Sequence, residues 1–230
     1  FISHINGELV FGGSLGEAVA KLRGAVGSPL SLKVARRGRT KPFDVQMIRA
    51  LTVAPNVTWR IERGVGIIDI NGFGQPTESE LQAAVTAIDR QAGGAALGYV
   101  VDLRSNAGGE FTSAVQVADA FLDKGEIVSQ RGRDAADIKR TQAKPGDLAD
   151  GRPVVVLIDR GSAAAAEIVA AALKDNGRAL VMGNNSFGMG AIQTRIPLNA
   201  GGAIKLTTSR YFTPSGKSLD EKGIEPDIDV

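Results

Sequence analysis

Three short segments carry the residues that could do chemistry, and each spans or follows the end of a predicted strand. In 100–109 an apolar strand runs into a polar turn with paired glycines, Gly108 and Gly109. Such glycines let backbone N–H groups point into a cleft. The segment 159–167 is a strand-to-helix turn, and 183–190 is a glycine-rich loop. A helix N-terminus of this kind suits a developing oxyanion, which is the chemistry of a hydrolase.

Each segment also has a purely structural interpretation. Glycines occur in many strand-to-helix turns, and the loop 183–190 could simply hold a buried methionine. Ser162 is predicted to be the N-cap of a helix, because its hydroxyl can accept a backbone N–H and good helix formers follow it. No segment alone identifies a function.

A match to the G-x-S-x-G nucleophile elbow lies at 12–16. That chemistry requires a histidine after the serine, whereas the only histidine, His4, precedes it. Ser14 and Glu17 have the spacing of a capping box, so we predict that Ser14 caps a helix. A serine hydrolase in this chain would therefore need a lysine as its base.

Composition excludes several classes of protein. The chain has no cysteine and one histidine, which removes Cys/His zinc sites, thiol nucleophiles and disulfides, and we predict no cofactor and no metal. A net charge of +2 and 5% aromatic residues speak against a nucleic-acid partner. No apolar run approaches the roughly 20 residues of a membrane span. The chain starts at Phe1 without a signal-peptide pattern, so we expect it to be the C-terminal part of a longer precursor.

Two parts of the chain are predicted to position these segments. In 1–52 we expect strands at 2–10, 30–36 and 43–49 and a helix over 15–24. After a connector at 51–55 we expect strands at 58–63, 66–70, 98–103, 126–130, 154–158, 179–182, 191–196 and 203–208, with helices over 78–91, 112–122 and 163–176. The run 154–158 is apolar throughout, which is typical of a strand covered on both faces. The predicted class is α/β.

The order of the three segments resembles one family, the carboxyl-terminal processing (tail-specific) proteases. The family motif D-L-R-x-N-P-G-G is similar to DLRSNAGG at 102–109. G-S-A-S-A-S-E-I is similar to GSAAAAEI at 161–168, and T-F-G-K-G-x-V-Q to SFGMGAIQ at 186–193. Two C-terminal motifs, L-T-T-x-R-Y-x-T-P-S-G-x-S and K-G-I-x-P-D-I-x-V, occur within 206–230. The resemblance covers nearly the whole chain.

The resemblance implies a fold and a setting. The fold is an α/β, ClpP/crotonase-like spiral core of ββα units at 53–230, preceded at 1–52 by the C-terminal part of a PDZ-like domain. The implied partners are protein or peptide substrates recognised at their C-termini or when unfolded, and homo-oligomer formation stays open. The implied location is periplasmic or otherwise extracytoplasmic.

The resemblance also assigns roles, and two of them fall on residues that cannot perform them. The family's serine nucleophile corresponds to Ala164 and its lysine base to Met189, while its helper glutamine is retained as Gln193. The family's backbone oxyanion donors correspond to Gly108 or Gly109 and to Ala165. Alanine has no hydroxyl, and a thioether does not take a proton at neutral pH. The chain should therefore not cut peptide bonds.

The missing serine and lysine have two possible explanations, deliberate inactivation and natural loss. Deliberate inactivation usually changes one residue, whereas Ala107 and Asn184 also depart from the family's proline and glutamate, which favours natural loss. A second hypothesis follows, in which the chain is a non-catalytic protein that keeps the cleft for a peptide or ligand. Asp175 matches a family aspartate, and we expect it to be structural and to lie beside Arg178.

Overall fold

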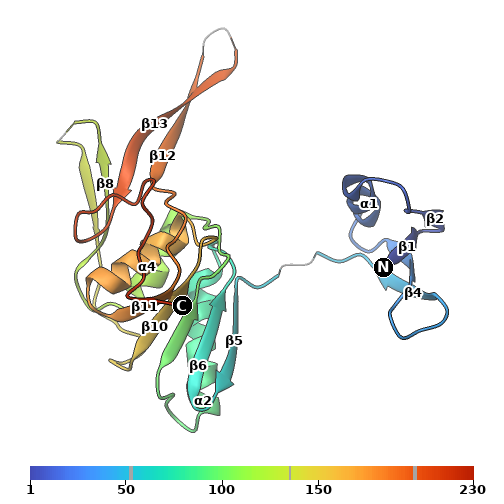
Figure 1. Ribbon diagram of the computed structural model, residues 1–230, viewed down its shortest axis with the longest axis horizontal. Coiled ribbons are helices and arrows are strands. Elements are labelled where there is room, and N and C mark those ends of the chain that lie inside the picture. The colour runs from blue at the N-terminus through green and yellow to red at the C-terminus, as the bar shows by residue number, and fades with distance from the viewer. Residues whose placement is uncertain (52–53, 135, 199–200) are drawn as a thin grey trace. The chain divides into compact units, whose positions relative to one another are not determined.

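The chain divides into two compact units, Phe1–Ala54 and Pro55–Val230 (Figure 1). A computed structural model describes residues 1–51, 54–134, 136–198 and 201–230. Part of the connector predicted at 51–55 lies outside the described residues. The assignment of the first unit to a PDZ-like domain stays a prediction.

The first unit is a four-stranded sheet with one helix. Its elements are β1 (Ile2–Ile5), β2 (Glu8–Leu9), α1 (Leu15–Leu22), β3 (Pro29–Val34) and β4 (Phe43–Ile48), and the strand order is β2-β1-β3-β4. The single strand predicted at 2–10 is two strands, because Asn6 and Gly7 take positive φ values of 50° and 84° and turn the chain. The predicted cap is confirmed: Ser14 Oγ accepts the Glu17 N–H at 3.2 Å, and Glu17 Oε2 accepts the Ser14 N–H at 3.0 Å.

The second unit carries the three segments of interest. Its elements are β5 (Val57–Glu62), β6 (Val65–Ile70), α2 (Thr77–Gln91), β7 (Tyr99–Asp102), α3 (Phe111–Asp119), β8 (Glu126–Gly132), β9 (Ile138–Gln142), β10 (Val154–Ile158), α4 (Ala165–Asp175), β11 (Ala179–Gly183), β12 (Ala191–Pro197), β13 (Ala203–Phe212) and β14 (Ile228–Asp229). A six-stranded sheet has the order β14-β11-β10-β7-β6-β5, in which only β5 pairs antiparallel. A second, antiparallel sheet has the order β12-β13-β8-β9.

The carboxyl ends of the parallel strands bring all three segments together. The loop 183–190 follows β11, which lies parallel beside β10 with Gly183 next to Ile158. The turn after β7 carries the paired glycines, and the turn after β10 leads into α4. Because β7 and β10 are neighbours in parallel register, Val101 lying beside Val156, these turns meet at one edge of the sheet.

Sequence reasoning was wrong about the surroundings of β10. Val154, Val156 and Ile158 are buried, but Val155 and Leu157 on the opposite face are only half-buried. Among the described residues of the second unit, the strand is therefore buried on one face and half-buried on the other.

Candidate active site

Position 164 lies on a strained turn between β10 and α4. Ala164 has φ 51° and ψ −106°, a conformation that residues with a side chain rarely adopt. The neighbouring Ala163 and Ala165 are buried, whereas Ala164 is partly exposed. The predicted N-cap was wrong, because the helix begins at Ala165 and the capping position is Ala164 rather than Ser162. The turn therefore presents the side chain of residue 164 to solvent.

Ser162 fastens this turn to the one after β7. It is fully buried, its hydroxyl donates to the Leu103 carbonyl oxygen at 2.8 Å, and its Oγ accepts the Asp159 N–H at 2.9 Å. A hydroxyl held in this way is not available as a nucleophile in place of residue 164.

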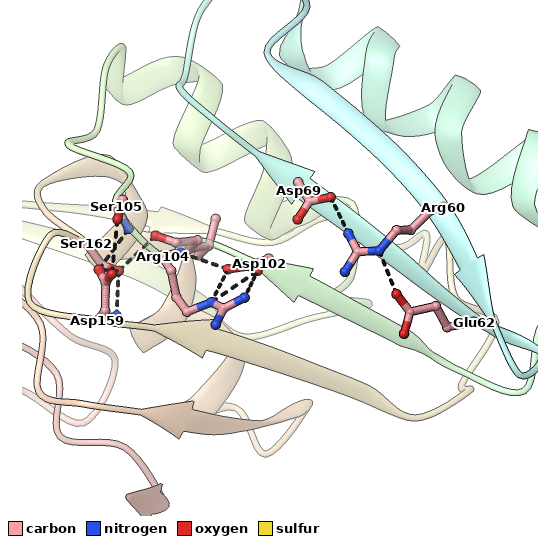
Figure 2. Close-up of polar contacts among 9 residues, drawn as sticks. Arg60, Glu62, Asp69, Asp102, Arg104, Ser105, Asp159 and Ser162 are labelled. Atoms are coloured by element: carbon pink, nitrogen blue, oxygen red, sulfur yellow. Dashed lines mark hydrogen bonds and ion pairs between the residues drawn. The ribbon is translucent and has the colours of Figure 1, made fainter. Parts of the chain in front are cut away.

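Asp159 makes a second link between the two turns (Figure 2). Its Oδ1 accepts the N–H groups of Ser105 at 2.8 Å and Gly161 at 2.9 Å, and its Oδ2 accepts the Ser105 hydroxyl at 3.1 Å. Burial raises the pKa of the Asp159 carboxyl, but these hydrogen bonds outweigh it and hold the pKa below its usual value. The carboxylate therefore braces both turns.

The glycine turn is held by Asn106, which is buried. Its amide nitrogen donates to the Ile70 carbonyl oxygen at 2.7 Å, and its Oδ1 accepts the Gly108 N–H at 2.8 Å. Its carbonyl oxygen accepts the Ala163 N–H at 2.9 Å. A Cβ added to Gly108 would lie only 3.0 Å from the Ala165 nitrogen, so the two turns are in close contact beside position 164.

The three candidate oxyanion donors differ in whether their N–H groups are already hydrogen-bonded within the protein. The Gly108 N–H is already bonded to Asn106. Among the described residues, the N–H groups of Gly109 and Ala165 donate to no protein acceptor. Gly109 has φ 146° and is exposed. Gly109 and Ala165 are therefore the two candidate donors that are free to bind a ligand oxygen.

Glu167 joins the helix start to the loop that carries Met189, and sequence reasoning gave it no role. The side chain is fully buried in the first turn of α4. Its Oε1 accepts the Gly188 N–H and the Ser186 hydroxyl, both at 2.6 Å. Its Oε2 accepts the N–H groups of Ala164 and Met189, both at 2.8 Å. Positions 164 and 189 are thus held around one oxygen atom.

The loop with Met189 is supported from behind by the C-terminal segment. Ser186 Oγ accepts the Ile224 N–H at 2.6 Å, and the Gly188 carbonyl oxygen accepts the Glu221 N–H at 2.9 Å. The side chain of Met189 is not buried, since the residue is 46% exposed. The loop therefore presents an apolar, partly exposed thioether side chain at position 189.

Two residues singled out from the sequence are not drawn into this cluster. Gln193 lies on β12 and is exposed, and no hydrogen-bond partner of its amide is found among the described residues. Asp175 ends α4, where its Oδ2 accepts the Ser215 N–H at 2.9 Å. Arg178 forms its ion pair with Asp147, at 2.9 Å, and none with Asp175 among the described residues.

The described residues contain neither a cluster of metal ligands nor a candidate membrane span. In 1–51, 54–134, 136–198 and 201–230, no group of three or more His, Cys, Asp or Glu side chains is arranged to hold a metal ion. None of the helices described for the chain has the length and apolar character of a membrane span.

Comparisons with known proteins point to one family. The family model for peptidase family S41 matches residues 64–230. A carboxy-terminal-processing protease of Bartonella bacilliformis is 48% identical over 231 residues, which cover all of this chain and 53% of that protein. A probable CtpA-like serine protease of Staphylococcus epidermidis is 32% identical over 231 residues, or 46% of its length. The chain spans about half the length of these curated relatives.

Solved structures agree with the sequence relatives. The photosystem II D1 C-terminal processing protease superposes with a TM-score of 0.70 at 30% identity, covering all of this chain and 62% of that one. A putative S41 protease from Bacteroides fragilis superposes with a TM-score of 0.66 at 20% identity, over all of this chain and 65% of that one, which shows a shared fold.

Proposed function

Because this chain belongs to peptidase family S41, among the C-terminal processing proteases, we propose that the cluster around Glu167 is a serine–lysine protease site that has lost both reactive groups. In this proposal Ala164 stands at the nucleophile position and Met189 at the base position. The backbone N–H groups of Gly109 and Ala165 form the oxyanion hole. Such a site belongs to a serine endopeptidase that acts on protein C-termini or unfolded proteins, and with Ala164 and Met189 in place this chain would not cleave them.

One observation carries the proposal. A single carboxylate oxygen of Glu167 accepts the backbone N–H of both Ala164 and Met189. A serine hydroxyl at the first position and a lysine amine at the second would project from adjacent backbone, as a nucleophile and its general base must. Alanine supplies no attacking oxygen, and methionine supplies no group that can take the proton.

The remaining parts support binding without turnover. A substrate carbonyl oxygen would accept hydrogen bonds from Gly109 and Ala165, next to the positive end of the α4 dipole. Gln193, on β12, stays a candidate helper through its match to the glutamine of the family motif. We place the protein outside the cytoplasm, since it resembles proteases that act there.

Restoration of the two groups tests the proposal. The double variant Ala164→Ser with Met189→Lys should cleave an unstructured protein substrate, while the parent chain and each single variant stay at least about a hundredfold slower, because nucleophile and base act as a unit. A matched control places the lysine on the other side of Gly188, as Phe187→Lys with Ala164→Ser, where the residue is also exposed. Equal activity of the control and the double variant, or none in a folded double variant, would refute the assigned positions.

A second candidate function is that of a natural pseudoprotease that holds a peptide or ligand. It is favoured by the exposed apolar side chains of Phe187 and Met189, which lie on the loop that Glu167 ties to the start of α4. Calorimetry with unstructured peptides should then show binding by the unaltered chain that weakens in Met189→Asp. Undiminished binding in that variant would place the ligand elsewhere.

A further inference from the structure

A fourth turn lies at the edge of the sheet that carries the candidate site. It comprises residues 71–74, which we call the Phe73 turn, and it follows β6. Because β6 is the parallel neighbour of β7, this turn meets the one that carries the paired glycines. The glycine pair touches two turns: Gly109 contacts the Phe73 turn, and Gly108 contacts the turn that leads into α4.

The backbone of Phe73, a buried residue, brackets Gly109. The Phe73 N–H donates to the Gly108 carbonyl oxygen at 3.2 Å, and the Phe73 carbonyl oxygen accepts the Glu110 N–H at 2.9 Å. These hydrogen bonds form an isolated parallel bridge between Phe73 and Gly109. In such a bridge the N–H of the bracketed residue points away from its partner strand, because backbone groups alternate in direction along a strand. The Phe73 turn therefore directs the Gly109 N–H away from itself.

The contact between Phe73 and position 109 is one of backbone with backbone. A Cβ added to Gly109, at its φ of 146°, would collide with the carbonyl group of Phe73. Only glycine allows two backbones to approach this closely. No side chain lies between them to absorb a movement. A shift of the Phe73 turn must therefore move the Gly109 N–H, which is one of the two candidate oxyanion donors.

Thr77, the first residue of α2, holds the Phe73 turn with its side chain. The residue is fully buried. Its Oγ1 accepts the Gly74 N–H at 2.9 Å and the side-chain amide of Asn56 at 3.0 Å, and it donates to the Gly72 carbonyl oxygen at 3.5 Å. A hydroxyl has one donor and two acceptor sites, so this one is fully used. It thereby fixes the residues on both sides of Phe73.

The hydroxyl serves the turn rather than the helix. The capping position of α2 is Pro76, which makes no side-chain capping bond. The partners of the Thr77 hydroxyl lie in the Phe73 turn and at Asn56, the residue before β5. The Asn56 carbonyl oxygen also accepts the Asn71 N–H at 2.7 Å. Thr77 and Asn56 together therefore hold the Phe73 turn from its first residue to its last.

We propose that Thr77 is a positioning residue for the oxyanion hole, an inference that rests on the function proposed above. Its hydroxyl fixes the Phe73 turn, and the backbone of Phe73 aims the Gly109 N–H at the carbonyl oxygen of a bound peptide. Thr77 itself does not contact the substrate. The alignment matters because a hydrogen bond weakens steeply as its angle departs from linearity, and stabilisation of developing charge depends on donors that are fixed in advance.

Kinetics of the restored double variant, Ala164→Ser with Met189→Lys, test this role. Adding Thr77→Val keeps the branched shape of the side chain but leaves the Gly74 N–H without its acceptor. We expect kcat to fall at least about tenfold while KM changes less than about twofold, because the misaligned donor acts on the transition state rather than on binding. Thr77→Ser keeps the hydroxyl and should restore kcat to within about threefold.

The matched control is Thr86→Val, further along the same helix. Thr86 is exposed, and its hydroxyl donates to the Gln82 carbonyl oxygen at 2.8 Å, within α2. This variant should leave kcat unchanged. A hydroxyl that served stability alone would lower the melting temperature in Thr77→Val without lowering kcat per folded molecule. An unchanged kcat in folded Thr77→Val therefore overturns the proposal.

A second measurement does not depend on cleavage. In the unaltered chain, the NMR amide resonance of Gly109 should move in Thr77→Val, return in Thr77→Ser and stay in place in Thr86→Val. If Thr77→Val does not fold, Asn56→Ala replaces it, because this change removes a donor to the same hydroxyl from a partly exposed residue. A restored double variant that folds and does not cleave refutes the proposed function, and the Gly109 resonance then decides the role of Thr77. A resonance that both Thr77→Val and Asn56→Ala leave in place overturns that role.

Discussion

Glu167 is the residue on which the candidate site depends most. A buried carboxylate is stable only when its oxygens are hydrogen-bonded, and here four donors converge on two oxygens. The sequence contained a signal for part of this, because an acid three residues after a capping position often accepts that residue's N–H. The other donors come from a loop some twenty residues further along the chain, which local pattern cannot bring to the helix.

Replacing this carboxylate should be costly. In Glu167→Gln one oxygen becomes an NH₂ group that faces N–H donors, so we expect the free energy of unfolding to fall by about 2–3 kcal/mol. Glu110→Gln removes the same charge from the exposed N-cap of α3, where the side chain makes no capping hydrogen bond, and should cost little. Urea unfolding followed by circular dichroism measures both. Equal losses in the two variants would contradict the role given to Glu167.

At the scale of elements, sequence patterns predicted the order of helices and strands well where apolar periodicity was strong. They missed β9, because Lys139, Arg140 and Thr141 give it no apolar alternation, and they missed the two-residue β14. They placed both glycines of the turn after β7 but could not tell which N–H was free. That depends on the side chain of Asn106, whose orientation is set by the Ile70 carbonyl on another strand.

The close approach of the two turns predicts the effect of a single methyl group. Gly108→Ala would place a Cβ 2.9 Å from the Ala163 carbonyl oxygen at φ 101°. Gly93→Ala is the control, since Gly93 has φ 85° with no atom within 4 Å of an added Cβ. Both substitutions should lower the free energy of unfolding by about 1 kcal/mol, because alanine at a positive φ is strained. We expect Gly108→Ala to lower the melting temperature further, and in the restored double variant to abolish cleavage.

At the scale of the whole molecule, the two units have very different cores. Among its described residues the first has three buried apolar residues, Ile5, Leu30 and Leu32, whereas the second has a continuous core around α4. Because small cores provide little stability, the first unit should open at lower free energy than the second. Hydrogen exchange should show amides of β3 exchanging well before those of β10. Ile5→Ala should accelerate exchange only in the first unit, and Ile68→Ala only in the second.

Acid should destabilise the second unit through Asp89. Hydrogen bonds from Arg152 at 2.7 and 2.9 Å, with one from the Tyr99 hydroxyl at 2.6 Å, lower the pKa of this carboxyl from 3.8 to about 2. A lowered pKa stabilises the fold above the unfolded-state value, and that stability is lost as the pH falls from about 4 to about 2.

Protonation of Asp89 should lower the free energy of unfolding by about 2 kcal/mol. Asp89→Asn should therefore flatten the dependence of unfolding free energy on pH in this window. A steep acid transition that persists in Asp89→Asn would assign the effect to other groups.

The backbone of Ala164 has a practical consequence. The turn holds φ at 51° although residue 164 has no hydroxyl. On our assignment of this turn, the site would accept a protein substrate as an active relative does and then hold it uncut. Immobilised on a resin, the chain would be a reagent for retaining the natural substrates of its family, intact, for identification by mass spectrometry.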